Sequence, residues 1–308
     1  MPPWGYSLSR RKLDAILLRA AESAGAEVRE GVGVDDLVFD GDRVVGVTTR
    51  SNHAEQGSIR ARLVVGAGGR NCPVARALRL QRRSRRRRID LLAHWATNGN
   101  SPGPQCELHV GPSSYVAAAP VENGVVNINC VVPQATLQRT PEPKLVYRDT
   151  LRGDPSLTRW TTGRRVEPVV ATDITPLTTL RATADGALLV GDSALFLDPF
   201  TGQGIYLALA SARLAAGVAT RALATRVVDR TALDEYDRLR ATEFVAKRRV
   251  SAAIQSILDR PWLNRRVIRA LRTNRELANT LAAVTGDLAP ASDAWQVGFG
   301  FRLASAAI

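Results

Sequence analysis

The residues best suited to chemistry in this chain lie in one stretch, from Leu188 to Leu214. It opens with a short apolar run, residues 187–190, whose pattern predicts a buried strand. Gly191 and Asp192 follow that run directly, so a carboxylate would stand at the carboxyl end of the strand. In an α/β fold, this edge of a parallel sheet is where ligands bind. Asp192 is therefore the first candidate binding residue.

A helix start follows in the same stretch, after a loop that contains an Asp-Pro pair. The sequence Gly202-Gln203-Gly204 opens a helix that we expect to run to about residue 224. A helix N-terminus offers free backbone N–H groups and a partial positive charge, and glycine lets a ligand approach them closely. Beside a carboxylate, such a terminus suits a ligand that carries hydroxyl groups and an electron-rich edge. The simpler alternative is a strand, a turn and a helix that only pack together.

The segment 191–205 resembles the GD motif of FAD-dependent oxidoreductases, the group that includes aromatic hydroxylases and geranylgeranyl reductases. In that family the Asp hydrogen-bonds a ribityl hydroxyl of FAD. The loop and the helix start lie against the isoalloxazine ring, where the helix dipole favours negative charge on the reduced flavin. The resemblance thus implies FAD as the cofactor and the following contacts: Asp192 with the ribityl chain, and Pro199, Gly202, Gln203 and Gly204 with the flavin edge.

Two earlier segments resemble the same family. Residues 8–14 resemble the start of a helix whose arginine lies near the FAD phosphates, which implies Arg10, with Arg11 as the reserve. Residues 63–76 resemble the family's DG motif, although Gly68 stands in place of its Asp. In the family that Asp is linked to contacts with both FAD and NAD(P)H. The departure leaves open whether NAD(P)H is the electron donor.

The order of the other elements predicts the fold. We expect a helix over 8–24, paired strands over 27–47, a strand over 61–65, an antiparallel meander over 89–135, and helices over 202–224, 234–258, 262–272 and 274–284. The strands 61–65 and 187–190 should lie parallel in one sheet. This mixture indicates an α/β fold, more closely α+β with an inserted antiparallel sheet. The resemblance implies an incomplete Rossmann-like FAD/NAD(P)-binding fold of the glutathione-reductase family, type 2.

These elements suggest a division of the chain into three parts. We assign 1–80 and 180–225 to a partial FAD-binding domain and 81–179 to an inserted antiparallel-sheet substrate domain. Residues 226–308 form a C-terminal helical region in this division. The C-terminal tail, with Val297, Phe299 and Phe301, is apolar enough to pack on the body of the protein or on a membrane surface.

The 308 residues contain no GxGxxG turn, which in this family cradles the FAD pyrophosphate. Gly31-Val32-Gly33 lacks the third glycine, and Gly66-Ala67-Gly68-Gly69 belongs to the DG-like segment. We therefore expect these residues alone to hold FAD weakly, through its flavin and ribityl half, and to expose an unpaired sheet edge. The alternative is a non-catalytic fragment or interaction protein that no longer holds FAD.

Composition narrows the class of protein. A hydrophobic fraction of 45% and a charged fraction of 23% are typical of a globular chain. No apolar run reaches the roughly 18 residues that span a bilayer, and no secretory signal is visible, so we expect a cytoplasmic protein without a transmembrane segment. Three widely spaced cysteines and three histidines argue against a disulfide framework and against a metal site.

The net charge of +13 comes almost entirely from arginine. The densest run is 82–88, in which Ser84 is the one residue that is not arginine. The run could bind nucleic acid, or an anionic substrate or cofactor phosphate, or it could form a solvated edge. No aromatic residues interleave it for base stacking, so we do not expect nucleic acid as a partner.

The resemblance implies an enzyme, a flavin-dependent monooxygenase or reductase that acts on a hydrophobic or aromatic small molecule. The sequence shows no nucleophile–base pair, and we assign no catalytic residue. The substrate would lie between the antiparallel sheet and the flavin, where four residues are candidates for lining it: His94, Trp95, His109 and Tyr115. Hydroxylases, halogenases, prenyl-chain reductases and cyclases share these motifs, so the reaction, the substrate and the oligomeric state stay open.

Overall fold

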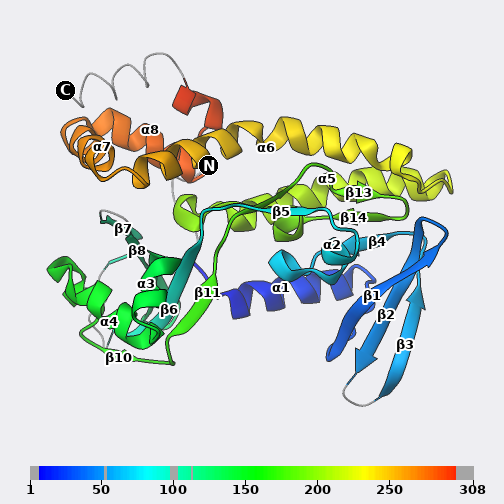
Figure 1. The fold of residues 1–308 in the computed structure, drawn as a ribbon, viewed down its shortest axis with the longest axis horizontal. Coiled ribbons are helices and arrows are strands. Elements are labelled where there is room, and N and C mark those ends of the chain that lie inside the picture. Colours follow the sequence, from blue (N-terminus) through cyan, green and yellow to red (C-terminus); the bar gives the residue numbers. More distant parts are fainter. Residues whose placement is uncertain (1–6, 52–53, 98–102, 112–113, 296–308) are drawn as a thin grey trace.

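The computed structural model describes residues 7–51, 54–97, 103–111 and 114–295. Figure 1 shows an elongated molecule with a large antiparallel sheet at one end and a three-stranded sheet at the other, and long helices run between them. The apolar tail at 297–303 lies outside the described residues, so its predicted packing is not tested.

A small parallel pair forms the centre of the site-bearing half. β4 (Val64–Gly66) and β14 (Ala187–Leu189) lie parallel, and β13 (Thr183–Ala184) adds an antiparallel strand beside β14. The predicted pairing of these two distant strands is therefore confirmed. Leu188 and Leu189 are fully buried, as expected of a strand in the core.

The predicted meander over 89–135 forms four strands of a six-stranded antiparallel sheet, to which two later strands are added. The strands of this sheet are β6 (Arg88–Ala96), β7 (Glu107–Val110), β8 (Tyr115–Val121), β9 (Val125–Pro133), β10 (Arg164–Arg165) and β11 (Val170–Asp173). One face packs on α3 (Gln134–Arg139), α4 (Pro143–Arg152) and the 3₁₀ turn η2 (Pro155–Trp160), and it buries Leu91, Ile128 and Trp160. The other face meets the C-terminal helices at one end, around Tyr115 and Val131.

Four helices form the long side of the molecule. They are α5 (Gly204–Ala224), α6 (Arg230–Leu258), α7 (Pro261–Thr273) and α8 (Arg275–Thr285), followed by η5 (Ala291–Trp295). α6 begins four residues before the predicted start, because the side chain of Asp229 accepts a hydrogen bond from the N–H of Ala232 and caps it there. Among the described residues, α5 is the one helix long and apolar enough to cross a membrane by length and composition. It packs on α6 and on the turn after β14.

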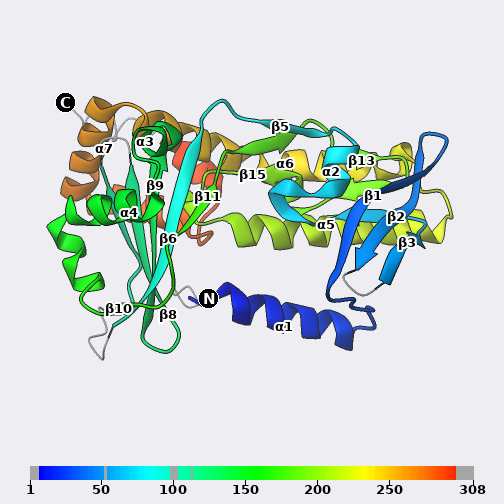
Figure 2. The same cartoon turned by 60° about the horizontal axis from the view of Figure 1, so that its bottom comes forward.

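The N-terminal helix α1 (Arg10–Ser23) lies along the molecule beside α5 (Figure 2). Ser9 caps it by accepting from the N–H of Lys12, as the sequence predicts, and Ser9 also donates to Glu122 in the β8–β9 turn. None of its residues is buried, and Ile16 is 54% exposed.

Two small sheets complete the description. β1 (Val32–Asp40), β2 (Arg43–Ser51) and β3 (Ala54–Arg60) form the antiparallel sheet at the far end. β5 (Gln81–Arg83), β12 (Leu177–Thr179) and β15 (Leu195–Phe196) form the second, next to α6. The short α2 (Pro73–Ala77) follows β4, with Pro73 at its first turn, where a missing N–H costs nothing.

Candidate functional site

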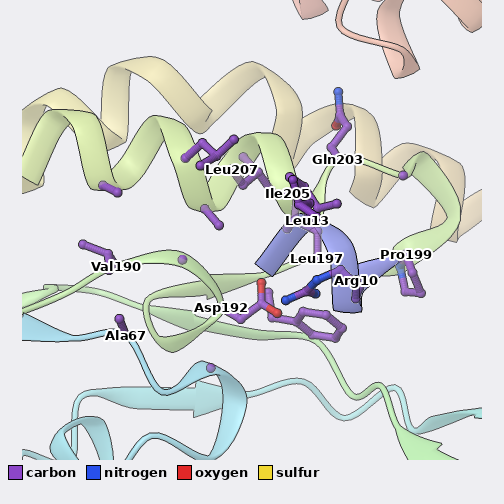
Figure 3. Close-up of a pocket in the computed structure, with 18 of the residues that line it drawn as sticks. Arg10, Leu13, Ala67, Val190, Asp192, Leu197, Pro199, Gln203, Ile205 and Leu207 are labelled. Atoms are coloured by element: carbon purple, nitrogen blue, oxygen red, sulfur yellow. The ribbon is translucent and has the colours of Figure 1, made fainter. Parts of the chain in front are cut away.

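A pocket of about 530 Å³ lies between α1, the turn after β4, the turn after β14 and the start of α5 (Figure 3). Its volume is in the range of small-molecule sites, roughly 300–1,000 Å³. The candidates named from the sequence that line it are Arg10, Asp192, Pro199, Gly202, Gln203 and Gly204. Arg11, the reserve for Arg10, is exposed and does not line the pocket.

The turn after β14 is fixed to α5. Gly191 has a φ of +57°, and a Cβ there would lie 3.3 Å from the Cβ of Ala208, so only glycine fits without strain. The N–H of Gly191 donates to Oγ of Ser211 at 2.8 Å. Ser193 Oγ donates to the carbonyl of Gly69 at 3.0 Å, which joins the GD turn to the DG-like segment. These bonds hold the backbone that carries Asp192 in one position.

Asp192 has the surroundings of a ligand-binding carboxylate. Within the described part of the chain, no protein group donates a hydrogen bond to it. Burial raises its pKa, while the guanidinium groups of Arg70 and Arg10 oppose that shift. Figure 3 shows Arg10 and Asp192 reaching into the same pocket. A partly desolvated carboxylate without a donor suits hydroxyl groups such as those of a ribityl chain.

The start of α5 leaves open space for a ligand. A Cβ at Gly69, Gly202 or Gly204 would meet no other atom within 4 Å, although all three line the pocket. Gly202 ends the short 3₁₀ turn η4 (Pro199–Thr201) with a φ of +68°. The N-terminal end of α5, which carries the positive end of the helix dipole, therefore borders open space in the pocket that a flat ring could fill. These residues fit the flavin and ribityl half of FAD.

Gln203 lines the pocket, but its side chain turns away from it (Figure 3). Its Nε2 donates to the carbonyl of Val284 at 3.2 Å and to Oδ1 of Asp287 at 2.8 Å. Lys247 also contacts Asp287. The Gly286-Asp287 turn near the C-terminus thus anchors the loop that opens α5. Gln203 therefore presents its backbone, and not its side chain, to a ligand in the pocket.

The loop between β15 and α5 is tied to the large antiparallel sheet. Tyr115 OH donates to Oδ1 of Asp198 at 2.7 Å, and the N–H of Phe200 donates to the same atom at 3.1 Å. Burial and the Asp198 carboxylate raise the pKa of Tyr115, so its hydroxyl stays a donor. The sheet therefore meets the pocket at Leu197 and Pro199, which both line it.

The four residues proposed to line a substrate pocket do not converge. His94 and Tyr115 project from one face of the sheet, where His94 contacts Glu167. Trp95 projects from the opposite face, and its Nε1 donates to Tyr147 OH at 3.0 Å. His109 lies opposite Val116 in the strand register, so it projects from the same face as Trp95. Its Nδ1 is within hydrogen-bond distance of Oδ2 of Asp154, at 3.1 Å. As substrate contacts, all four stay predictions.

Arg70 is a residue of this region that sequence reasoning missed. It follows the glycines of the DG-like segment, and its guanidinium lies 4.8 Å from the centre of the Phe196 ring. Its charge opposes the rise in the pKa of Asp90 and Asp192 and contributes to the lowered pKa of Asp173. The one signal in the sequence was its position next to the glycine turn.

Asp90 was also missed. Its Oδ2 accepts from Nδ2 of Asn129 at 2.7 Å, and its Oδ1 is buried without a partner in the described structure. Burial raises its pKa from 3.8 to about 6, with the nearby Asp198 adding to the rise. It projects from the same sheet face as Tyr115, so it stands on the side of the sheet that meets the pocket.

Asp90→Asn should stabilise the protein above pH 6 and change it little below pH 4. The folded-state pKa of Asp90 lies above its unfolded value, so the wild type loses stability as pH rises through about 6. At roughly 1.4 kcal/mol per pKa unit, the asparagine variant should gain about 2–3 kcal/mol at pH 7.5. Urea unfolding at pH 4 and pH 7.5 measures the difference, with the exposed Asp42→Asn as the control. An equal effect of Asp90→Asn at both pH values would contradict this assignment.

Comparisons with known proteins agree with the geometry. A family model described as an FAD binding domain matches residues 4–251, so the chain belongs to that family. It is 28% identical over 245 residues to a tryptophan 2-halogenase of Chondromyces crocatus, covering 76% of this chain and 47% of that protein. It is 27% identical over 244 residues to digeranylgeranylglycerophospholipid reductase 2 of Methanococcoides burtonii, covering 77% and 58%. The chain spans about half the length of these curated relatives.

Solved structures show the same fold. A flavoprotein/dehydrogenase from Cytophaga hutchinsonii superimposes with a TM-score of 0.80 at 20% identity, covering 99% of this chain and 75% of that one. A myxobacterial chondrochloren halogenase gives a TM-score of 0.71 at 23% identity, covering 78% and 57%. The predicted family, fold class and cofactor FAD are thus confirmed. Neither the family match nor these relatives supports the non-catalytic alternative.

Proposed function

We propose that this chain carries the flavin-binding part of an FAD-dependent oxidoreductase that acts on a hydrophobic or aromatic small molecule. The observation that carries the proposal is one pocket, in a chain of the FAD-binding family. This pocket joins the Asp192 carboxylate, which has no hydrogen-bond donor among the described residues, to the glycine-lined start of α5. The similar proteins include a halogenase and several reductases by name, which favours redox chemistry on an organic substrate. We also expect the protein to work in the cytoplasm.

Each part of the pocket has a task in this proposal. FAD, when bound, supplies reversible two-electron chemistry. Asp192 would accept hydrogen bonds from the ribityl hydroxyls and so hold the cofactor in place. The N–H groups at the start of α5 would stabilise negative charge on it. The charges of Arg10 and Arg70 favour the ionised form of Asp192 and so oppose the rise in its pKa that partial burial causes.

The substrate would lie on the sheet face that meets the pocket. That face presents Asp90 and Asn129 beside Tyr115. A carboxyl group with a pKa of about 6 can accept a proton from a substrate O–H or N–H near neutral pH and return it. Asp90 is therefore our candidate for proton transfer.

The test supplies reduced FAD chemically, so that it does not depend on the native electron donor. In the first arm, the protein is mixed with reduced FAD, indole, bromide and oxygen. In the second arm, it is mixed anaerobically with reduced FAD and a geranylgeranyl lipid. Mass spectrometry would detect a hydroxyl or bromine in the first arm and added hydrogen pairs in the second. We expect product in one arm, and we expect Asp90→Asn to slow it mainly above pH 6. Flavin-loaded protein that gives no product in either arm would contradict the proposal.

A further inference from the structure

A second cavity, of about 650 Å³, lies on the other side of the β15 segment from the flavin pocket. Its walls are the strands β5, β12 and β15 on one side and α6 on the other. Residues 196–198 line both cavities, so a ligand here would be one chain segment away from the flavin edge. We call this cavity the arginine groove, after five residues that line it: Arg82, Arg83, Arg86, Arg248 and Arg249.

The charge of the groove is only partly balanced. Arg83 lies 3.7 Å from Asp173 and Arg86 lies 3.0 Å from Asp259, so these two have carboxylate partners. Arg82, Arg248 and Arg249 have no carboxylate partner within the described ranges. Arg248 and Arg249 come from α6, whereas the others come from the arginine run, so the fold brings two distant basic segments to one cavity.

The lining of the groove also holds an orphaned amide. Gln255 is 5% exposed, and neither its Nε2 nor its Oε1 has a hydrogen-bond partner in the described structure. Ser251, one turn earlier on α6, lines the groove as well and is 4% exposed. A buried amide without hydrogen-bond partners destabilises the folded state, and a ligand in the groove could supply those partners.

Apolar side chains lie among these polar groups. Leu177, Leu195 and Leu197 line the groove beside the arginines. Guanidinium groups bind phosphate oxygens in pairs, and the leucines suit an apolar or planar body attached to the phosphate. The one carboxylate lining the groove, that of Asp198, is 3% exposed and already accepts from Tyr115.

We propose that the arginine groove binds the phosphate groups of a small ligand that carries an apolar or planar body. Two sources have this chemistry, a nicotinamide adenine dinucleotide phosphate and a phospholipid. The site places such a ligand against the segment that borders the flavin pocket. Phosphate binding in the groove depends on the arginines and on the amide of Gln255. It does not require that the neighbouring pocket binds flavin.

Titration calorimetry with inorganic pyrophosphate tests the site in the 308-residue chain. Arg248→Gln with Arg249→Gln should weaken pyrophosphate binding about tenfold at low salt, because two charge-assisted contacts are lost. The matched control, Arg139→Gln with Arg152→Gln, removes the same charge from exposed positions on α3 and α4 and should stay within about twofold of wild type. Equal affinities for both double variants would overturn the proposal.

A second variant tests the buried lining without removing charge. Gln255→Met keeps the length of the side chain and removes the orphaned amide, so stability should hold or rise. Pyrophosphate affinity should fall several-fold. Affinity unchanged from wild type would overturn the role of this residue.

Competition separates the two sources of phosphate. NADPH, NADH and dihexanoyl phosphatidylglycerol are each titrated against bound pyrophosphate. Displacement by NADPH but not NADH points to the nucleotide, and displacement by the lipid points to a headgroup; both support a phosphate site. Failure of all three to displace pyrophosphate would overturn the proposal. FAD affinity, measured on the same Arg248→Gln and Arg249→Gln protein, should be unchanged, which keeps this test independent of the flavin pocket.

Discussion

Gly204→Leu should weaken flavin binding strongly while the protein stays folded. A side chain at Gly204 points into space where a Cβ meets no atom within 4 Å, so it disturbs no packing. The same space belongs to the pocket that we assign to the flavin ring. Overlap of a bulky side chain with a seated ring costs at least about 2 kcal/mol, or roughly thirtyfold in affinity.

The matched control for this variant is Gly217→Leu. Gly217 lies on the exposed side of the same helix, and a Cβ there meets only the end of the Arg221 side chain, at 3.8 Å. Both variants replace a helical glycine, so both should hold or slightly raise the free energy of unfolding. Flavin fluorescence titration should show a large loss for Gly204→Leu alone. Equal flavin affinity in the two variants would place the ring elsewhere.

Asp192→Ala should weaken FAD binding by about ten- to a hundredfold. The carboxylate has no hydrogen-bond donor from the described protein, and we assign its acceptor oxygens to the ribityl hydroxyls. Loss of a hydrogen bond to a charged group costs on the order of 1.5–3 kcal/mol, which gives this range. Because burial raises the pKa of Asp192, removing it should not destabilise the fold at pH 7.5.

Lumiflavin supplies the internal control for Asp192→Ala, because it has the flavin ring without the ribityl chain. The variant should bind lumiflavin as wild type does and bind riboflavin and FAD more weakly by the same factor. A loss that is equal for lumiflavin and FAD would show that Asp192 acts on the ring or on the fold rather than on the ribityl chain.

The features that the sequence made predictable were local ones. The apolar run 187–190, its glycine ending and the glycines before α5 specify a strand, a turn and a helix without help from distant residues. The parallel pairing of β4 and β14 follows from two similar runs, 63–65 and 187–190, since each is apolar at every position and is followed by glycine.

Contacts between distant segments were not predictable in the same way. The side chain of Gln203 turns toward Asp287, 84 positions later, and nothing near Gln203 signals that direction. Asp90 gains its raised pKa from burial by several strands and from Asp198, which no local pattern records. His94 and Trp95 are a different case, because adjacent residues of a strand point to opposite faces of the sheet. This alternation alone predicts that the two side chains do not line the same pocket.

The central claim is that the pocket at the start of α5 holds the flavin and ribityl half of FAD. Equilibrium titration of riboflavin fluorescence with the 308-residue chain tests it most directly, because riboflavin contains that half and no pyrophosphate. We expect saturable binding of one riboflavin per chain, weakened by Asp192→Ala and by Gly204→Leu but not by Gly217→Leu. Folded wild-type protein that shows no saturable binding, or binding that these two pocket variants leave unchanged, would contradict the claim.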